Sequence, residues 1–395
     1  MLPKDTHHWG TQRNCIRELF EYSLKRKAEI GAENVYDFSI GNPSIPAPEC
    51  FEKAIREIME LDSVFIHGYT SAAGLPTARH AIAQYMNSRY GTALSGDNIY
   101  ITCGCTAGLA SSMKGLLLPG EETIMFAPFF PEYRVFTEGA GGVAVVVPPD
   151  MNTLEPDLEA FEKALTDKTK VVVVNSPNNP SGVVLGDECL TKIADILRRH
   201  EEKTGRRVFI VSDEPYRELV YDGVEVPCIM KYYADTIICY SFSKCLSIPG
   251  ERIGYFAVNP DMRDSQDVFD SIAGAARCYG YVNAPSLMQR VIEKCLGATA
   301  DMDKYRANRD KLYKGLTDIG FQCIKPDGAF YLFMKTPGGD AKAFSELAKR
   351  FELMLVPSND FGVDGFVRIA YCVDPDMIDE AMPRFAQLAK VCGIK

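Results

Sequence analysis

The chain has 395 residues, of which 46% are hydrophobic, and this length suggests two or three domains with large cores. Its formal net charge is -10, whereas a protein that binds nucleic-acid backbones in general needs a surplus of Lys and Arg. The composition therefore favours a globular enzyme and disfavours a nucleic-acid-binding protein.

The start of the chain, residues 1–14, is polar and lacks the apolar core of a signal peptide. No stretch approaches the roughly 20 apolar residues of a membrane span, so we expect a cytoplasmic protein with no membrane partner. The 13 cysteines show no paired spacing apart from Cys103 and Cys105. An odd number of cysteines without an export signal predicts reduced, mostly buried thiols and no metal site.

A helix is expected near residues 16–30, followed by an extended segment to Pro48. Short apolar runs then alternate with longer amphipathic stretches, which predicts βαβ units and a mostly parallel sheet flanked by helices, an α/β fold. Nearly continuous Val and Ile in these runs indicates burial on both faces. The predicted strands are 98–102, 123–126, 143–147, 171–175, 208–213, 236–241 and 253–258.

Residues 187–203 predict a crossover helix, because Leu190, Ile193 and Leu197 form an apolar stripe that stops before Gly205. After this part of the chain, long helices and short strands predict a smaller α+β domain, with strands at 321–324, 330–334, 354–356 and 367–371. We therefore predict an N-terminal arm at 1–46, a large domain at 47–286 and a small C-terminal domain at 287–395.

Three of the predicted strands end in polar clusters. Asn179 follows the first of these strands, Asp213 and Tyr216 close the second, and Lys244 follows the third. Because ligands gather at the carboxyl ends of parallel strands, we expect these four side chains at one edge of the sheet. A lysine there can condense with an aldehyde once desolvation or nearby positive charge lowers its pKa.

With further motifs along the chain, these clusters resemble the class I and II aminotransferases, enzymes of fold type I that use pyridoxal 5'-phosphate (PLP). The similarity is to bacterial aspartate and aromatic aminotransferases, and it covers most of the chain. No single motif is decisive, but so many in the right order argue against coincidence. In chain order they are Gly41-Asn42-Pro43, Tyr69, Gly104-Cys105-Thr106, Asn179-Pro180-Ser181-Gly182, Asp213-Glu214-Pro215-Tyr216, Lys244 with Arg252, Gly328-Ala329-Phe330-Tyr331 and Arg368.

The resemblance implies that Lys244 holds PLP as a Schiff base and then carries a proton. Asp213 would face the ring nitrogen, which must stay protonated for PLP to act as an electron sink. Tyr216 and Asn179 would hydrogen-bond the ring oxygen, and Phe130 would stack on the ring. Taken singly, each of these residues also has a plain structural interpretation, as a surface lysine, a helix cap, a turn residue or core packing.

The cofactor phosphate needs several donors and some positive charge. Gly104, Cys105 and Thr106 lie between a predicted strand and a predicted helix, where backbone amides are free to bind an anion. By resemblance, the Ser241 hydroxyl and Arg252 complete this site. A plain strand-turn-helix connection explains the glycine equally well.

Arg368 lies inside an apolar strand, a costly placement unless the guanidinium is paired. The family uses its counterpart for the α-carboxylate of the substrate, with Gly41 and Asn179 on the same side. A buried salt bridge within the small domain would also explain this arginine. Tyr69 resembles the tyrosine that reaches the neighbouring subunit's phosphate, which implies a homodimer with shared active sites.

The implied activity is transfer of the α-amino group of an L-amino acid (aspartate, aromatic or alanine-like) to a 2-oxo acid such as 2-oxoglutarate. Thr106 stands where some bacterial aspartate aminotransferases have a lysine, so strict aspartate preference is in doubt. Glu251 replaces an aromatic residue of many relatives, and it either orients Arg252 or faces solvent. A PLP-dependent carbon–sulfur β-lyase on the same fold is the main alternative. A regulator on this fold would need a basic DNA-binding extension, which residues 1–45 do not provide.

Overall fold

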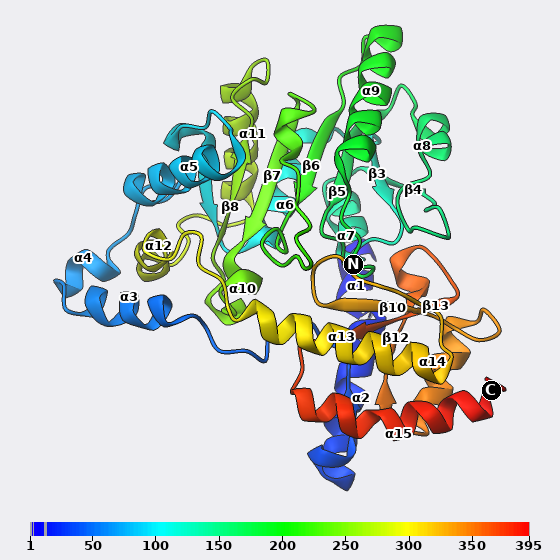
Figure 1. Ribbon diagram of the computed structural model, residues 1–395. Helices are drawn as coiled ribbons and strands as arrows, with labels where there is room; N and C mark the ends of the chain where they lie inside the picture. The colour runs from blue at the N-terminus through cyan, green and yellow to red at the C-terminus, as the bar shows by residue number, and fades with distance from the viewer. Residues whose placement is uncertain (1, 3, 12–13, 395) are drawn as a thin grey trace.

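A seven-stranded sheet forms the centre of the computed structural model, which describes residues 2, 4–11 and 14–394 (Figure 1). The strand order is β2-β8-β7-β6-β5-β3-β4, and every pair is parallel except the two that β8 makes with β2 and β7. All seven predicted strands are confirmed, with identical C-terminal ends. The strands are β2 Ile99–Thr102, β3 Glu122–Phe126, β4 Val143–Val147, β5 Thr169–Asn175, β6 Phe209–Asp213, β7 Thr236–Ser241 and β8 Gly254–Val258.

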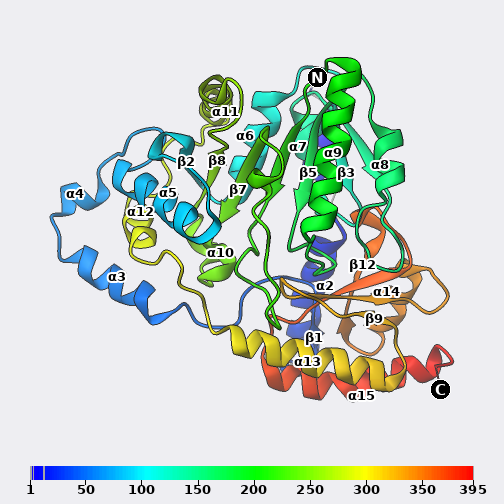
Figure 2. The same ribbon diagram turned by 45° about the horizontal axis from the view of Figure 1, so that its top comes forward.

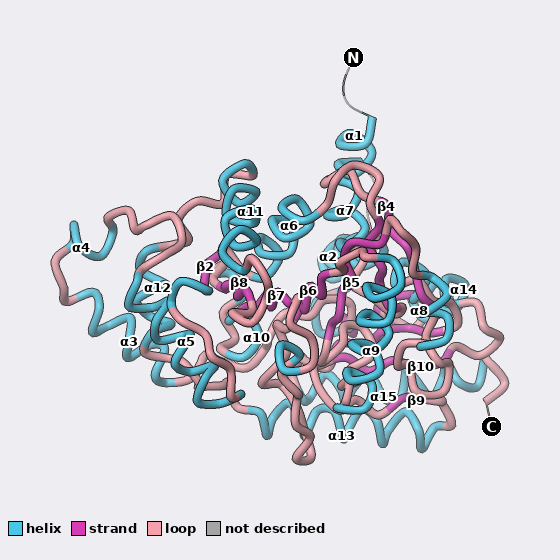
Figure 3. The backbone as a smooth tube through the Cα atoms, turned by 90° about the horizontal axis from the view of Figure 1, so that it is seen from above, coloured by secondary structure: helices cyan, strands magenta, loops and turns pink. Residues whose placement is uncertain are grey.

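Alternating side chains of these strands build two hydrophobic cores, one on each face of the sheet. Val172 and Val174 contribute to the core under α5 and α9, whereas Val171 and Val173 contribute to the core under α6, α7 and α11. Figure 3 shows the two helix layers on opposite sides of the strands. The expectation of burial on both faces is wrong for β4, where only Val147 is fully buried, because β4 is an edge strand.

The helices of the two layers are α5 Pro76–Tyr90, α6 Cys105–Leu116, α7 Glu132–Gly139, α8 Leu158–Ala164, α9 Asp187–Thr204, α10 Phe242–Cys245 and α11 Ser265–Cys278. Helix α9 confirms the predicted crossover helix. It ends at Gly205, whose φ of +68° lies in the left-handed region that glycine adopts without strain. No helix among the described residues is both long enough and apolar enough to cross a membrane.

A second, four-stranded antiparallel sheet of order β12-β13-β10-β9 lies below the first in Figure 1. Its strands are β9 Cys323–Ile324, β10 Tyr331–Lys335, β12 Val356–Pro357 and β13 Phe366–Ala370, with helices α13 Met302–Ile319, α14 Ala341–Lys349 and α15 Pro375–Val391 around them. Strand β9 begins later than predicted, because the Phe321 amide still donates to Leu316 O at the end of α13. The predicted strand 354–356 is split between β11 (Leu353–Met354) and β12.

The chain start packs against these C-terminal elements. Helix α1 spans Lys4–Thr11 and α2 spans Cys15–Ile30, and β1 (Tyr36–Asp37) pairs in parallel with β11. Arg26 of α2 pairs with Glu352 at 2.7 Å. Helices α3 (Glu49–Met59) and α4 (Ser63–His67) extend away from the central sheet (Figures 1 and 2), and α12 (Ser286–Glu293) packs against α3, α4 and α5. The domain boundaries at residues 46 and 286 stay predictions.

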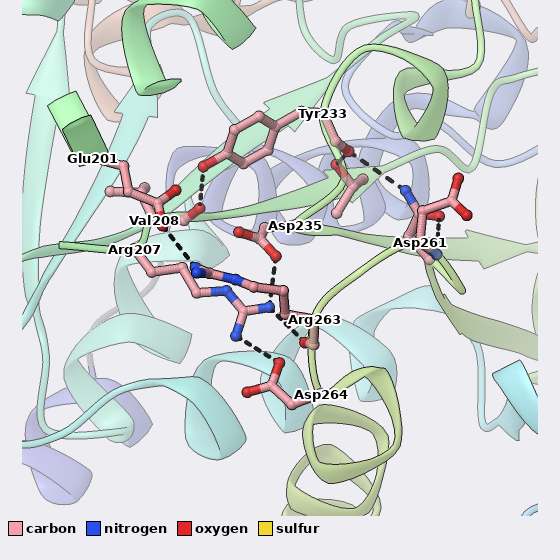
Figure 4. Close-up of polar contacts among 10 residues, drawn as sticks. Glu201, Arg207, Val208, Tyr233, Asp235, Asp261, Arg263 and Asp264 are labelled. Carbon is pink, nitrogen blue, oxygen red and sulfur yellow. Dashed lines mark hydrogen bonds and ion pairs between the residues drawn. The ribbon is translucent and has the colours of Figure 1, made fainter. Parts of the chain in front are cut away.

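A charged cluster ties together the loops at the amino ends of β6 and β7 (Figure 4). Arg207 donates to Asp235 at 2.5 Å, to Asp264 at 2.7 Å and to the Arg263 carbonyl at 3.0 Å, and its guanidinium lies over the Phe209 ring. Because Asp235 is buried, this pair is better shielded from water than the surface pairs of the molecule. The cluster fixes one end of the sheet and leaves the carboxyl ends of the strands to form a site.

Candidate active site

A cavity of about 270 Å³ lies at the carboxyl ends of β5, β6 and β7, between the two sheets. All the residues that the sequence predicted for the site line this cavity, except Gly104 and Tyr69. The predicted residues in the lining are Gly41, Cys105, Thr106, Phe130, Asn179, Asp213, Tyr216, Ser241, Lys244, Arg252 and Arg368. Ile16, Ile40, Leu109, Pro215, Ser243, Pro249 and Tyr331 complete it.

Lys244 lies in the short helix α10, directly after β7. Its Nζ donates to Gly41 O at 2.7 Å and lies 5.4 Å from the centre of the Phe330 ring. The pKa of the Lys244 amine is lowered to about 8, mainly by burial and also by the positive charges of Arg252 and Arg368. The amine is therefore far closer to its neutral, nucleophilic form than a surface lysine.

Asp213, the last residue of β6, points its carboxylate into the same cavity. Cys105 Sγ donates to Oδ1 at 2.9 Å, and the Tyr133 hydroxyl donates to Oδ2 at 2.5 Å. The Asn175 amide holds the Asp213 carbonyl at 2.8 Å. The pKa of the Asp213 carboxyl is raised to about 6, because burial outweighs the effect of the two side-chain hydrogen bonds.

Tyr133 is a residue of the site that the sequence analysis missed. It lies on α7, three residues after Phe130, and it is buried against the edge of that ring at 5.8 Å between ring centres. The one available signal was its position three residues after Phe130, since a turn in which the Tyr133 amide donates to Phe130 O leads into α7. Nothing in the sequence relates Tyr133 to Asp213, because α7 and β6 meet only in the folded chain.

The start of α6 provides an anion-binding end of the cavity. Gly104 is its N-cap residue with a φ of +83°, and a Cβ atom here would lie 2.9 Å from Arg252 Nη2. Arg252 donates to Pro249 O at 3.0 Å, which holds its guanidinium near the free amides of the helix. Ser241 Oγ lies 2.7 Å from Ser243 Oγ, at the beginning of α10. Glu251 is exposed, and no bond among the described residues joins it to Arg252, so it faces solvent.

Arg368 lies in the middle of β13 and is buried. Its Nη1 donates to Asn179 Oδ1 at 3.0 Å, its Nη2 donates to Ser39 O at 2.6 Å, and its Nε has no protein partner among the described residues. The guanidinium stacks on the Tyr331 ring at 4.5 Å. No carboxylate of the described residues pairs with it, so the alternative of a buried salt bridge is wrong. A buried guanidinium with a free donor is suited to a carboxylate ligand.

Two tyrosines close the cavity beside Lys244. The hydroxyls of Tyr216 and Tyr331 lie 3.0 Å apart, and Tyr331 had no predicted role although its motif was part of the resemblance. Gly41 passes so close that a Cβ atom there would lie 2.0 Å from the Tyr331 hydroxyl, which explains the glycine. Tyr69 is different, since its side chain is 97% exposed and lies outside the cavity of its own chain.

These groups suit an aromatic aldehyde that carries a phosphate. A buried amine at Lys244 would take the aldehyde, a carboxylate at Asp213 would face a ring nitrogen, and the start of α6 with Arg252 would hold an anion.

Residues 33–385 match the family model for aminotransferase class I and II. The chain belongs to this family. The aminotransferase is 32% identical to a probable aspartate/prephenate aminotransferase of Thermus aquaticus, over 88% of this chain and 89% of the relative. It is 30% identical to aromatic-amino-acid aminotransferase 2 of Thermococcus litoralis, over 95% of both chains. A solved structure of an amino transferase from Eubacterium rectale matches with a TM-score of 0.96 and 48% identity, over 99% of both chains.

The predicted family, the fold type and PLP-dependent transfer of an amino group are thereby confirmed. PLP is the cofactor of this aminotransferase, as it is of its family. None of these three matches is named as a carbon–sulfur lyase, so nothing in them favours that alternative.

Proposed function

We propose that this aminotransferase moves the α-amino group of an L-amino acid of the aspartate, aromatic or alanine type to a 2-oxo acid such as 2-oxoglutarate. The observation that carries the proposal is the convergence of the Lys244 amine, the Asp213 carboxylate and the Arg368 guanidinium on one cavity, with an Nε that has no partner among the described residues. The names of the relatives from Thermus aquaticus and Thermococcus litoralis support substrates of the aspartate and aromatic types.

PLP supplies an electron sink that stabilises negative charge at the substrate Cα. In our proposal, Lys244 binds the cofactor covalently and later moves the proton at Cα with its neutral amine. Asp213 would face the ring nitrogen and hold its proton there, and Phe130 would lie against the ring. The Tyr216 hydroxyl and the Asn179 amide would bind the ring oxygen and orient the ring.

The phosphate of the cofactor and the α-carboxylate of the substrate are both anions, and we assign each of them to a different positive group. We assign the phosphate to the backbone of Gly104, Cys105 and Thr106, with the Ser241 hydroxyl and Arg252. The substrate α-carboxylate binds Arg368, whose Nε has no partner in the described part of the chain, next to Asn179 and Gly41. Because Arg368 binds the α-carboxylate, it orients the substrate in the cavity that Lys244 also lines.

A donor and acceptor screen tests this function. Holoprotein is mixed with a panel of L-amino acids, and the visible spectrum of the cofactor is followed before and after a 2-oxo acid is added. We expect at least one donor to convert the cofactor to its amine form, and a 2-oxo acid to reverse the change. A spectrum that no donor alters would contradict the proposal. Pyruvate and ammonia released without an oxo-acid acceptor would instead identify a β-lyase.

We also propose a homodimer with shared active sites. Tyr69 follows α4, where Val64 is 80% exposed and Phe65 is 55% exposed, and exposed apolar groups of this size are typical of an interface. A second copy of the chain that covers α4 would bring Tyr69 to the phosphate end of its partner's cavity.

Subunit mixing tests the shared site. Lys244→Met and Tyr69→Ala are each expected to be poorly active, but their heterodimer contains one site with both native residues. Random exchange makes half of the dimers mixed, so activity should recover to about a quarter of the wild-type value. Native mass spectrometry confirms that mixed dimers form, because the two variant chains differ in mass. Mixed dimers without any recovery would show that Tyr69 serves no site of the partner.

For the location we propose the cytoplasm. All 13 cysteines are free, and most of the buried ones lie in elements of the core. Free thiols in this number fit a reducing compartment.

A further inference from the structure

Neutral side chains, and no cation of the described residues, hold the buried Asp213 carboxylate. Among the described residues it forms no ion pair, and its two side-chain partners are neutral donors, the Cys105 thiol at 2.9 Å and the Tyr133 hydroxyl at 2.5 Å. An ionised carboxylate away from water is costly unless hydrogen bonds replace the lost hydration. The two donors therefore decide how readily this carboxylate stays charged.

The two donors come from different elements and bind different oxygens. Cys105 is the first residue of α6 and bonds Oδ1, whereas Tyr133 lies on α7 and bonds Oδ2. The carboxylate is thus fixed in rotation between them. Each oxygen of a carboxylate can accept about two hydrogen bonds, so capacity remains for a donor that enters from the cavity.

Cys105 meets the requirements for a neutral donor at this position. Its side chain is 7% exposed and lines the cavity, and burial raises the pKa of its thiol further above its ordinary value. The thiol therefore keeps its proton, and no second negative charge competes with Asp213. The other titratable groups around the carboxylate are Tyr133 of α7, Cys239 of β7 and the adjoining Glu214 and Tyr216.

We propose that Cys105 is a positioning residue for amino-group transfer: its thiol, together with the Tyr133 hydroxyl, keeps the Asp213 carboxylate ionised and turned toward the cavity. The inference rests on the proposed role of Asp213 at the ring nitrogen. It assigns the Cys105 side chain a different task from its backbone amide, which belongs to the phosphate end.

Substitution separates the two tasks, because Cys105→Ala removes the thiol and keeps the amide. We expect this variant to bind PLP about 5- to 10-fold more weakly, as the loss of one hydrogen bond from a weak thiol donor implies. The acid limb of its kcat profile should move upward by about half a pH unit, because the pKa of Asp213 rises when a donor is lost. PLP affinity is measured by equilibrium titration of the apoprotein, which does not depend on turnover.

Two further variants make the test specific. Cys105→Ser restores a donor and should bind PLP within about twofold of wild type. Cys189→Ala removes a thiol that is also 7% exposed but lies on α9, and both readouts should stay unchanged.

The inference is overturned if Cys105→Ala binds PLP as wild type does, or if Cys105→Ser loses as much affinity as Cys105→Ala. The inference is also overturned if Cys105→Ala weakens PLP binding while the acid limb of its kcat profile stays fixed, since that pattern indicates a loss of packing alone. A wild-type protein that binds no PLP would instead refute the proposed function.

Discussion

The Lys244→Met variant should lose amino-group transfer by a factor of about 10⁴, the upper end of the range for a positioned acid–base group, and keep its fold. Among the described residues that line the cavity, Lys244 has the only amine, and its neutral form is what binds an aldehyde or accepts a proton. Met keeps most of the aliphatic volume of Lys but has neither capacity. The variant should still bind PLP, more weakly, through the groups assigned to the phosphate and the ring.

The stability of the same variant tests the environment of the amine. Burial lowers the pKa of Lys244 from 10.5 to about 8, so the charged form is disfavoured in the folded chain. At about 1.36 kcal/mol for each pKa unit, the cost of keeping the charge at neutral pH is roughly 3 kcal/mol. That cost is fully present below about pH 8 and disappears as the pH rises toward 10.5. The Met apoprotein should therefore gain stability over the wild-type apoprotein at pH 7 and lose the advantage at high pH.

Turnover, PLP binding and thermal unfolding of the apoprotein at several pH values check these expectations. Lys114→Met is the matched control, because Lys114 is an exposed lysine on α6 and its loss should change none of the three. Retention of more than one hundredth of wild-type turnover would remove Lys244 from its assigned role. If the Lys244→Met apoprotein were more stable than the wild-type apoprotein by the same amount at every pH, the Lys244 amine would not be desolvated.

The fold could be predicted from the sequence where local pattern decides structure. Runs such as Val171–Val174 are too apolar and too β-branched to face water, and all seven predicted strands of the large sheet form. The pattern cannot show which strand lies at an edge, since that depends on sheet order. For this reason β4 looks like a central strand in sequence although its first residue, Val143, is 48% exposed.

The candidate site also contains residues that the sequence could predict and residues that it could not. Asn179, Asp213 and Lys244 follow strands, so the topology of a parallel sheet brings them together without further information. Tyr133 and Tyr331 were not assigned, because their contacts depend on how α7 and β10 pack against the large sheet. Tyr69 was named only by resemblance, and a single chain cannot show its place because the chain exposes it.

The second large effect is expected for Asp213→Asn, which should lower kcat by about 10² to 10³ with little change of shape. Asn fills the same space, but it removes the negative charge that faces the ring nitrogen, and an unpaired buried charge costs about 3–5 kcal/mol. The amide group also faces Cys105 and Tyr133, both of which now donate to Asp213. One of them would meet an N–H group, so a buried donor is left without a partner.

The folding stability of the Asp213→Asn variant should partly offset this loss. The pKa of the Asp213 carboxyl gives the sign of the pH dependence that the substitution removes. That pKa is raised from 3.8 to about 6, so the folded chain binds the proton more tightly and loses stability as the pH rises through this window. Asp213→Asn removes this dependence, and its unfolding should vary less between pH 4 and pH 6 than that of wild type.

Asp235→Asn is the matched control for Asp213→Asn, because Asp235 is another buried carboxylate, held by Arg207 at the amino end of β7. It should lower the melting temperature and leave kcat unchanged below the transition, since it lies at the opposite end of the sheet. Steady-state kinetics and PLP titration at 25 °C, compared for the two variants, separate loss of charge at the ring from loss of a buried carboxylate in general. If Asp213→Asn kept more than a tenth of wild-type kcat, or if both variants lost it equally, the carboxylate would act only on the fold and not on the cofactor.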